Sequence, residues 1–288
     1  MIRLPAPRRA ASSRRAASSR RAASARRGGA GRPPLALLIP ATAAAVFLLG
    51  PLVALLARAP WSRLPALLAQ PAAGEALRLS LFAATLATLL CLVTGVPLAW
   101  LLAQPRLPGR SLLRALVVVP LVLPPVVGGV ALLMLFGRRG LLGAPLEALT
   151  GLTIPFTAAA VVLAEAFVAL PFLVLTVEGA LRSADRRHEE AAATLGANRL
   201  TVFRRVTLPT ALPGIAAGAV LAWARALGEF GATVTFAGSF PGRTQTMPIA
   251  VYLALESDPD AALALSAVLL AVSVLVLALL RDRWLVRP

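Results

Sequence analysis

Six apolar segments, each close to the ~20 residues needed to cross a bilayer as an α-helix, dominate this 288-residue sequence. Because a spanning segment must satisfy its own backbone hydrogen bonds, such segments restrict the chain to an all-α, polytopic membrane fold. The mean hydropathy of +0.81 and the 14% of charged residues are typical of that class. The expected transmembrane helices are residues 35–57, 79–103, 114–136, 154–177, 212–237 and 261–280.

The third apolar segment contains the run VPLVLPPVVGG, in which three prolines stand close to two glycines. Proline removes a backbone donor from a helix and clashes with the preceding turn. We therefore expect a kink in this helix, as a feature either of a transport path or of plain packing.

Residues 1–32 contain ten Arg, no acidic residue and a repeated RRAASS unit. A segment with so few core-forming residues predicts a disordered cytoplasmic tail, separate from a transmembrane permease domain over residues 33–288. A dispensable extension or an over-called start site is the simplest interpretation of the tail. A basic arm that contacts lipid headgroups or nucleic acid is the alternative.

The distribution of Arg predicts the orientation in the membrane. With an internal N-terminus, the segments after residue 32 place 12 Arg on the cytoplasmic side and 6 outside. Cytoplasmic loops carry the positive excess, so both termini and the loop at residues 183–210 are expected in the cytoplasm.

Several kinds of chemistry are excluded by residue counts. The chain has no Lys, which a phosphate-binding P-loop requires, so any ATPase must be a separate chain. A single Cys (Cys91) and a single His (His188) exclude an internal disulfide and a Cys/His zinc cluster. We expect no catalytic residue, no metal and no cofactor in this chain.

Three ionisable residues are expected at membrane depth: Glu165, Arg225 and Glu229. Charges there cost several kcal/mol and normally face a partner or a water-filled space. The i, i+4 spacing of Arg225 and Glu229 predicts an ion pair on one helix face, with Glu165 as a second partner across helices. A buried structural pair is favoured over a role in passing an anion.

A charged stretch between the fourth and fifth apolar segments is predicted to form two short helices. Ser183 is a candidate N-cap of the first helix, and Gly196 suits the left-handed position that ends it. Asn198 is a candidate N-cap of the second helix, which Pro209 and Pro213 are expected to stop.

The same stretch resembles the EAA motif of bacterial ABC-importer permeases. Glu190-Ala191-Ala192 is followed at the motif's spacing by Gly196, Val206 and Leu208-Pro209, with Val206 where the family usually has Ile. The resemblance implies a type I (MetI-like) importer architecture whose loop docks into a groove of the ATP-binding subunit. The expected docking residues are Glu189, Glu190, Ala191, Ala192, Leu195, Gly196 and Phe203.

A narrower resemblance covers most of residues 79–284. The segments LVLPPVVGGVALLMLFGRRGLLG and ARALGEFGATVTFAGSFPGRTQTMPIAVY are similar to the molybdate branch of these permeases, with sulfate, thiosulfate and tungstate permeases as alternatives. The candidate pore and intramembrane residues are Glu165, Arg225, Gly228, Glu229, Gly231 and Thr233.

The resemblance also implies the partners. We expect a homodimer in the bacterial inner membrane, two ATP-binding subunits that hold ATP and Mg, and an extracytoplasmic oxyanion-binding protein. Lipid is the surrounding solvent, and no nucleic acid is expected. Two other classes stay open: a proton-coupled secondary transporter that uses Glu165 and Glu229, and a membrane scaffold with a nucleic-acid-binding arm.

Overall fold

The computed structural model describes residues 35–105, 107–185 and 187–284, so the predicted tail at residues 1–32 lies outside the described residues. Every regular element within those ranges is a helix, and no strand is found in them. The chain divides into a first unit that ends at Ala54 and a second unit that begins at Leu55. Helix α2 (Leu35–Arg58) is 24 residues long and apolar throughout, which is enough to cross a bilayer.

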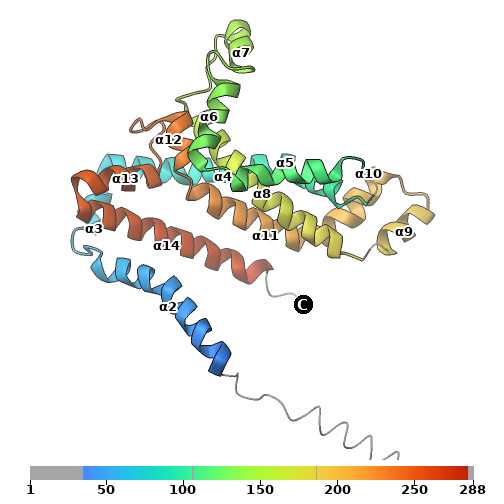
Figure 1. The fold of residues 1–288 in the computed structure, drawn as a ribbon, viewed down its shortest axis with the longest axis horizontal. Helices are drawn as coiled ribbons and strands as arrows, with labels where there is room; N and C mark the ends of the chain where they lie inside the picture. Colours follow the sequence, from blue (N-terminus) through green and yellow to red (C-terminus); the bar gives the residue numbers. More distant parts are fainter. Residues whose placement is uncertain (1–34, 106, 186, 285–288) are drawn as a thin grey trace, which may run out of the picture. The chain divides into compact units, whose positions relative to one another are not determined.

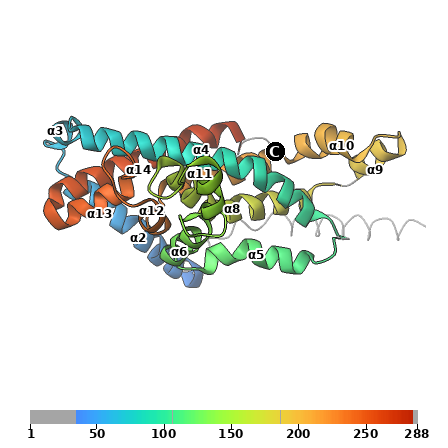
Figure 2. The same cartoon turned by 90° about the horizontal axis from the view of Figure 1, so that it is seen from above.

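Three long helices form the centre of the second unit. Helix α4 (Pro71–Ala103), α8 (Ala158–Ser183) and α11 (Leu208–Leu227) pack against one another (Figures 1 and 2). Small residues allow the close approach: a Cβ at Gly95 of α4 would lie 2.8 Å from Leu173 Cδ2 of α8. This packing buries alanines on the facing sides, including Ala83 and Ala169.

A second group of helices lies at the end of this unit away from α9 (Arg187–Thr194) and α10 (Arg199–Val202). Helix α13 (Met247–Ser257) packs against α14 (Pro259–Trp284) and α4, and α3 (Leu64–Leu68) contacts the same two long helices (Figure 1). A buried hydrogen bond from Met247 N–H to Ser80 Oγ, 2.7 Å, joins the start of α13 to α4.

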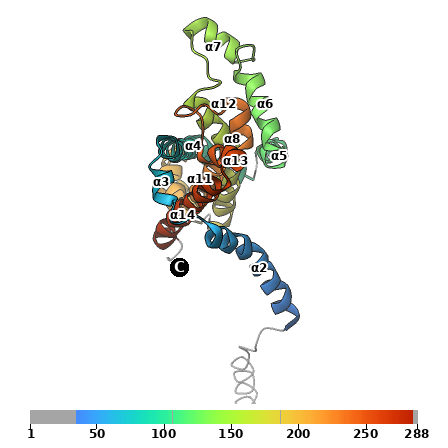
Figure 3. The ribbon, with the colours of Figure 1, turned by 90° about the vertical axis from the view of Figure 1, so that its left-hand side faces the viewer.

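The predicted kink in the third apolar segment is confirmed, and it is sharp. Helix α5 (Arg110–Val122) and α6 (Pro125–Phe136) meet at 116°. Pro124 and Pro125 lack the donors that would continue the helix, so the apolar segment breaks here into α5 and α6. Helix α6 leads to α7 (Gly143–Thr150), and both run away from the three central helices (Figure 3).

The fifth predicted span, residues 212–237, is also divided. Helix α11 ends at Leu227, and α12 (Gly231–Ala237) begins after a break, packing against α6 and α8. In the other direction α10, η1 (Phe203–Thr207) and α11 join into a single helical stretch, Arg199–Leu227.

The prediction that Pro209 and Pro213 stop the second loop helix is therefore wrong. Pro209 occupies the first turn of α11, where its missing N–H is tolerated, and it follows a π-helical turn, η1 (Phe203–Thr207). In that turn Leu208 N–H donates to Phe203 O, so the hydrogen-bond register widens ahead of the proline.

Large apolar side chains cover the outer faces of the helices, as in a protein whose solvent is lipid. Five of the described helices are long and apolar enough to cross a membrane, or six if the bent α5–α6 pair is counted as one.

Candidate functional site

A helical loop projects from the end of the second unit where α8 stops and α11 starts (Figures 1 and 2). It consists of α9 (Arg187–Thr194), α10 (Arg199–Val202) and η1, and no residue of α9 or α10 is buried. We call residues 187–207, the helical part of the loop predicted at residues 183–210, the coupling loop, after the docking role that the resemblance implies.

The start of the coupling loop differs from the prediction. Helix α8 runs through Ser183, whose Oγ donates to Ala180 O (2.9 Å), so Ser183 closes α8 and does not cap α9. Asp185 serves instead, because its Oδ1 accepts a hydrogen bond from Arg187 N–H (3.0 Å). The apolar face of α8 continues as far as Leu181, which explains why the helix passes the predicted cap.

The middle of the coupling loop follows the prediction. Gly196 has a φ of +82° and ends α9, and Ala197 N–H donates to Ala192 O (3.1 Å) across the turn. Asn198 caps the next helix, with Oδ1 accepting from Thr201 N–H (2.8 Å). Both predicted helix ends at this turn are confirmed.

One contact holds the coupling loop together and another attaches it to the rest of the unit. Within the loop, Thr207 Oγ1 donates to Glu189 Oε1 (2.5 Å), which joins η1 to α9. Phe203 packs edge-on against Trp100 of α4, with 5.5 Å between ring centroids. A cavity of about 670 Å³ lies between the loop and the end of α4. Glu189 and Phe203 thus make contacts within the chain.

The other predicted docking residues form an exposed surface. Leu195, in the turn after α9, is 88% exposed, and Leu200 of α10 is 59% exposed. Glu190 and Ala191 are exposed beside them. Apolar side chains next to a carboxylate and a flat alanine face suit contact with another protein.

The coupling loop is mechanically continuous with the interior of the protein. Helical residues run without a break from Arg199 to Leu227, a length of about 44 Å.

An ion pair lies at the Leu227 end of this helical stretch. Arg225 Nη2 is 2.6 Å from Glu229 Oε2, and Glu229 is almost completely buried. The other carboxylate oxygen, Oε1, accepts a hydrogen bond from Ala232 N–H (2.8 Å) and so caps the first turn of α12. Glu229 holds the ends of two helices together.

Glu165 does not share this pair. Both Glu165 and Arg225 are described, and no ion pair joins them; Glu165 Oε2 is buried without a hydrogen-bond partner. Glu165 is close enough to Glu229 for electrostatic interaction between the two side chains. Of the remaining candidate pore residues, Gly231 and Thr233 are buried inside the protomer, whereas Gly228 is exposed.

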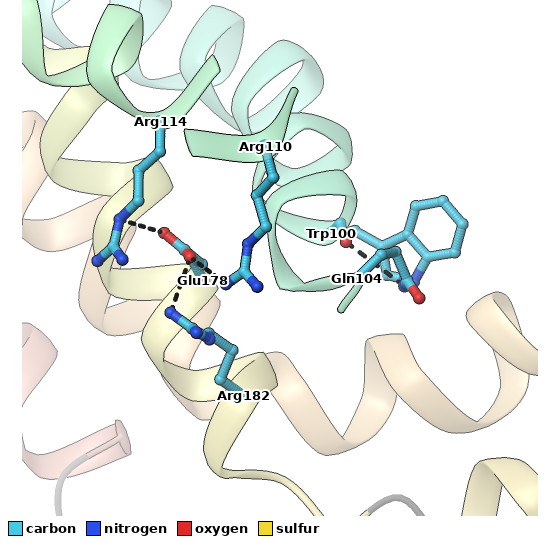
Figure 4. Close-up of polar contacts among 6 residues, drawn as sticks. All are labelled: Trp100, Gln104, Arg110, Arg114, Glu178 and Arg182. Carbon is cyan, nitrogen blue, oxygen red and sulfur yellow. Dashed lines mark hydrogen bonds and ion pairs between the residues drawn. The ribbon is translucent and has the colours of Figure 1, made fainter. Parts of the chain in front are cut away.

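A second charged cluster was not predicted from the sequence (Figure 4). Buried Glu178 of α8 lies 3.4 Å from Arg110, 3.5 Å from Arg114 and 3.2 Å from Arg182. We call these four residues the Glu178 cluster. The i, i+4 spacing of Glu178 and Arg182 is visible in the sequence, but the two arginines of α5 are supplied by the fold.

The known proteins that this chain resembles are membrane subunits of transport systems. The profile of the family described as "Binding-protein-dependent transport system inner membrane component" matches residues 95–287. The molybdenum transport system permease protein ModB of Mycobacterium tuberculosis is 54% identical over 83% of this chain and 90% of that protein. ModB of Escherichia coli is 43% identical over 74% and 93%, respectively. The sulfate transport system permease protein CysT of Salmonella typhimurium is 38% identical over 80% and 83%.

Solved structures share the fold. A bacterial ABC transporter that imports the acidic polysaccharide alginate superimposes with a TM-score of 0.67 at 18% identity, covering 86% of this chain and 95% of that one. The MetNI methionine ABC transporter gives a TM-score of 0.54 at 22% identity, covering 72% and 90%. The predicted all-α, MetI-like importer fold is confirmed.

Proposed function

The chain belongs to the family of binding-protein-dependent transport system inner membrane components, and from that premise we propose that it is the permease subunit of an ATP-driven importer that carries molybdate into the cytoplasm. The observation that carries the substrate is the gradient of identity: 54% to a molybdenum permease over most of both chains, against 38% to a sulfate permease. The alternatives within the class are tungstate and sulfate or thiosulfate.

The protein is a transporter subunit and not an enzyme, and its ATPase is a separate chain. The chain has no Lys for a phosphate-binding loop, so ATP and Mg belong to the partner. The apolar helices support a multi-pass protein of the inner membrane. For the orientation we rely on the Arg distribution, and we propose that both termini are in the cytoplasm. The assembly we propose has two permease copies, two ATP-binding subunits and one extracytoplasmic oxyanion-binding protein.

In this proposal the exposed face of the coupling loop is the contact with the ATPase. Leu195 is the apolar anchor, and Glu190 supplies a charge-assisted contact at its side. The turn at Gly196 keeps α9 short, which suits insertion into a groove.

The continuous helix from α10 to α11 carries the movement inward. When the ATPase subunits close, a shift of α10 moves α11 as a rigid rod, because packed helices slide or rotate rather than bend. The rod ends at the break after Leu227, where Glu229 links it to α12. Helices α11 and α12 therefore change their relative angle at this break as the path alternates between outward and inward openings.

The break also bears on the choice between the two roles of the intramembrane charges. Arg225 is paired with Glu229, and each carboxylate oxygen of Glu229 has a partner. These contacts favour a structural ion pair at the break between α11 and α12 over a free charge that attracts an anion. Gly228 and part of Arg225 remain exposed and are the best candidates of this region to face the path.

Reconstitution tests the proposal. The permease, its ATP-binding subunits and the binding protein are placed in vesicles, and ATP hydrolysis and uptake are measured with molybdate, tungstate or sulfate as the only oxyanion. We expect molybdate-loaded binding protein to stimulate hydrolysis several-fold, with sulfate far weaker. Molybdate uptake without the ATPase, driven by a proton gradient, would overturn the proposal in favour of a secondary transporter.

A further inference from the structure

The Glu178 cluster carries more positive charge than its carboxylate neutralises. Three guanidinium groups surround a single buried carboxylate, which leaves a net charge of two positive units. Each guanidinium offers about five N–H donors, and one carboxylate has room for about four. Donors therefore remain without a protein acceptor from the cluster itself, at the start of α5 where the helix N-terminus adds further positive potential.

The cluster borders a cavity of about 760 Å³. Along α5 the lining changes in character: Arg110, Ser111 and Arg114 lie in its first two turns, and apolar residues follow. The apolar part of the lining consists of Ala115, Val118, Val119, Val122 and Leu123. The cavity is thus charged where α5 begins and apolar where it ends.

The dimensions match one leaflet of a bilayer. From Arg114 to Leu123 the helix rises about 14 Å, close to half of a hydrocarbon core ~30 Å thick. Arg182, the third arginine of the lining, stands at the end of α8 that leads into the coupling loop. The charged end therefore lies toward the coupling loop, at the membrane surface on that side.

We propose that this cavity binds an anionic phospholipid of the inner leaflet. Its phosphate group lies on Arg110, Arg114 and Arg182, and one acyl chain lies along the apolar part of α5. The leaflet rests on the orientation in the proposed function, whereas the binding chemistry does not. A small free oxyanion would use the three arginines but leave the apolar lining uncovered, whereas an anionic phospholipid satisfies both parts.

The lipid has a mechanical consequence. Helix α5 is attached to the central bundle mainly through α8, and the Glu178 cluster is the polar part of that attachment. A phosphate group that shares the guanidinium donors stabilises α5 against α8 when the membrane is rich in anionic lipid.

Native mass spectrometry of the purified transporter complex tests the proposal, with phosphatidylglycerol and phosphatidylcholine added in turn. We expect selective retention of phosphatidylglycerol. Arg114→Gln, which leaves Glu178 paired with Arg110 and Arg182, should weaken it about fivefold. Ala115→Trp keeps every charge but fills part of the cavity next to its apolar lining, and it should also weaken retention of phosphatidylglycerol. Arg138→Gln, at a half-exposed ion pair with Glu147 on α7, is the matched control and should change nothing.

Three results would overturn the inference: equal retention of the two lipids, retention that Arg114→Gln leaves unchanged, or binding of molybdate alone that depends on the three arginines and is insensitive to Ala115→Trp. The last result would identify a site for the free oxyanion. A complex that responds to loaded binding protein yet shows no lipid selectivity leaves the proposed function intact and removes only this inference.

Discussion

Arg225 Nη2 lies 2.6 Å from Glu229 Oε2 across the end of α11, and the same carboxylate caps α12 through Ala232 N–H. The Glu229 side chain thus neutralises the charge of Arg225 on α11 and accepts a hydrogen bond from a free backbone N–H at the start of α12. An interrupted helix inside a membrane needs such a device, because an unsatisfied donor in hydrocarbon costs several kcal/mol.

Replacing this carboxylate should destabilise the protein. Glu229→Ala leaves Arg225 unpaired and the first turn of α12 uncapped, and we expect a loss of about 2–3 kcal/mol. Breaking a fully buried pair costs about 3–5 kcal/mol, and the side chain of Arg225 is 28% exposed, which reduces the effect. The measurement is thermal unfolding of the detergent-solubilised permease.

The double variant Arg225→Gln/Glu229→Gln is the control, because it removes both charges and keeps an oxygen for Ala232 N–H. We expect it to recover most of the loss. A stable Glu229→Ala protein that no longer transports would show instead that the charge acts on the permeating anion.

Docking of the coupling loop is tested at Gly196. Its φ of +82° disfavours most side chains, but Asp tolerates the left-handed region, and a Cβ there meets no atom within 4 Å. Gly196→Asp should therefore fold normally and lose at least tenfold in affinity for the ATPase subunit, measured by co-purification and binding titration. Gly151→Asp is matched in geometry, with φ +71° and open space at the end of α7, and should bind the ATPase normally. Equal affinity of the two variants would count against docking.

Leu195 provides a test of the apolar part of the same surface. Truncating an exposed leucine should leave stability unchanged within about 0.5 kcal/mol, whereas truncating an interface anchor costs 2 kcal/mol or more of binding energy. We expect Leu195→Ala to weaken ATPase binding about thirtyfold. Leu149→Ala, 85% exposed on α7, is the control. If both variants bind the ATPase equally well, Leu195 is not an anchor.

The sequence predicts the positions of the apolar helices better than it predicts where each helix ends or breaks. The turn at Gly196 and the cap at Asn198 were predictable because glycine and asparagine act on their nearest neighbours in the chain. The end of α8 was misplaced because continued packing at Leu181 outweighs the capping preference of Ser183. Local signals decide an element only where tertiary contacts are weak.

The interior charges show the same limit. Spacing predicted the Arg225–Glu229 pair, but not that Glu229 would also cap α12, a separate helix that packs against α6. The Glu178 cluster needs α5 and α8 side by side, and 68 residues separate Arg110 from Glu178 in the chain. Assignments that depend on such distant contacts require the fold.

The contact between Trp100 and Phe203 should determine how well ATP hydrolysis is coupled to transport. The ring pair, 5.5 Å between centroids, fastens η1 to the end of α4. Trp100→Ala should leave ATPase binding within twofold and raise basal ATP hydrolysis several-fold relative to molybdate uptake, because the loop moves without its contact to α4. Reconstituted vesicles give both rates. Phe240→Ala breaks the Phe156–Phe240 ring pair, which lies outside the α11–α12 break, and is the aromatic control; the idea fails if both variants change the ratio alike.

Close packing of α6 against α12 should make Gly129 intolerant of any side chain. A Cβ at this position would lie 2.7 Å from Thr235 Cβ and 2.8 Å from Ala232 O, and the backbone carbonyl cannot move without disturbing the turn that Glu229 caps. Overpacking of this kind costs about 1–3 kcal/mol, so Gly129→Ala should unfold at a clearly lower temperature than the parent. Gly74→Ala, where no atom lies within 4 Å and alanine is the better helix former by about 1 kcal/mol, should be neutral or stabilising. Equal unfolding temperatures for the two variants would show that α6 can separate from α12 at little cost. In that case α6 would not hold α12 in place at the break after Leu227.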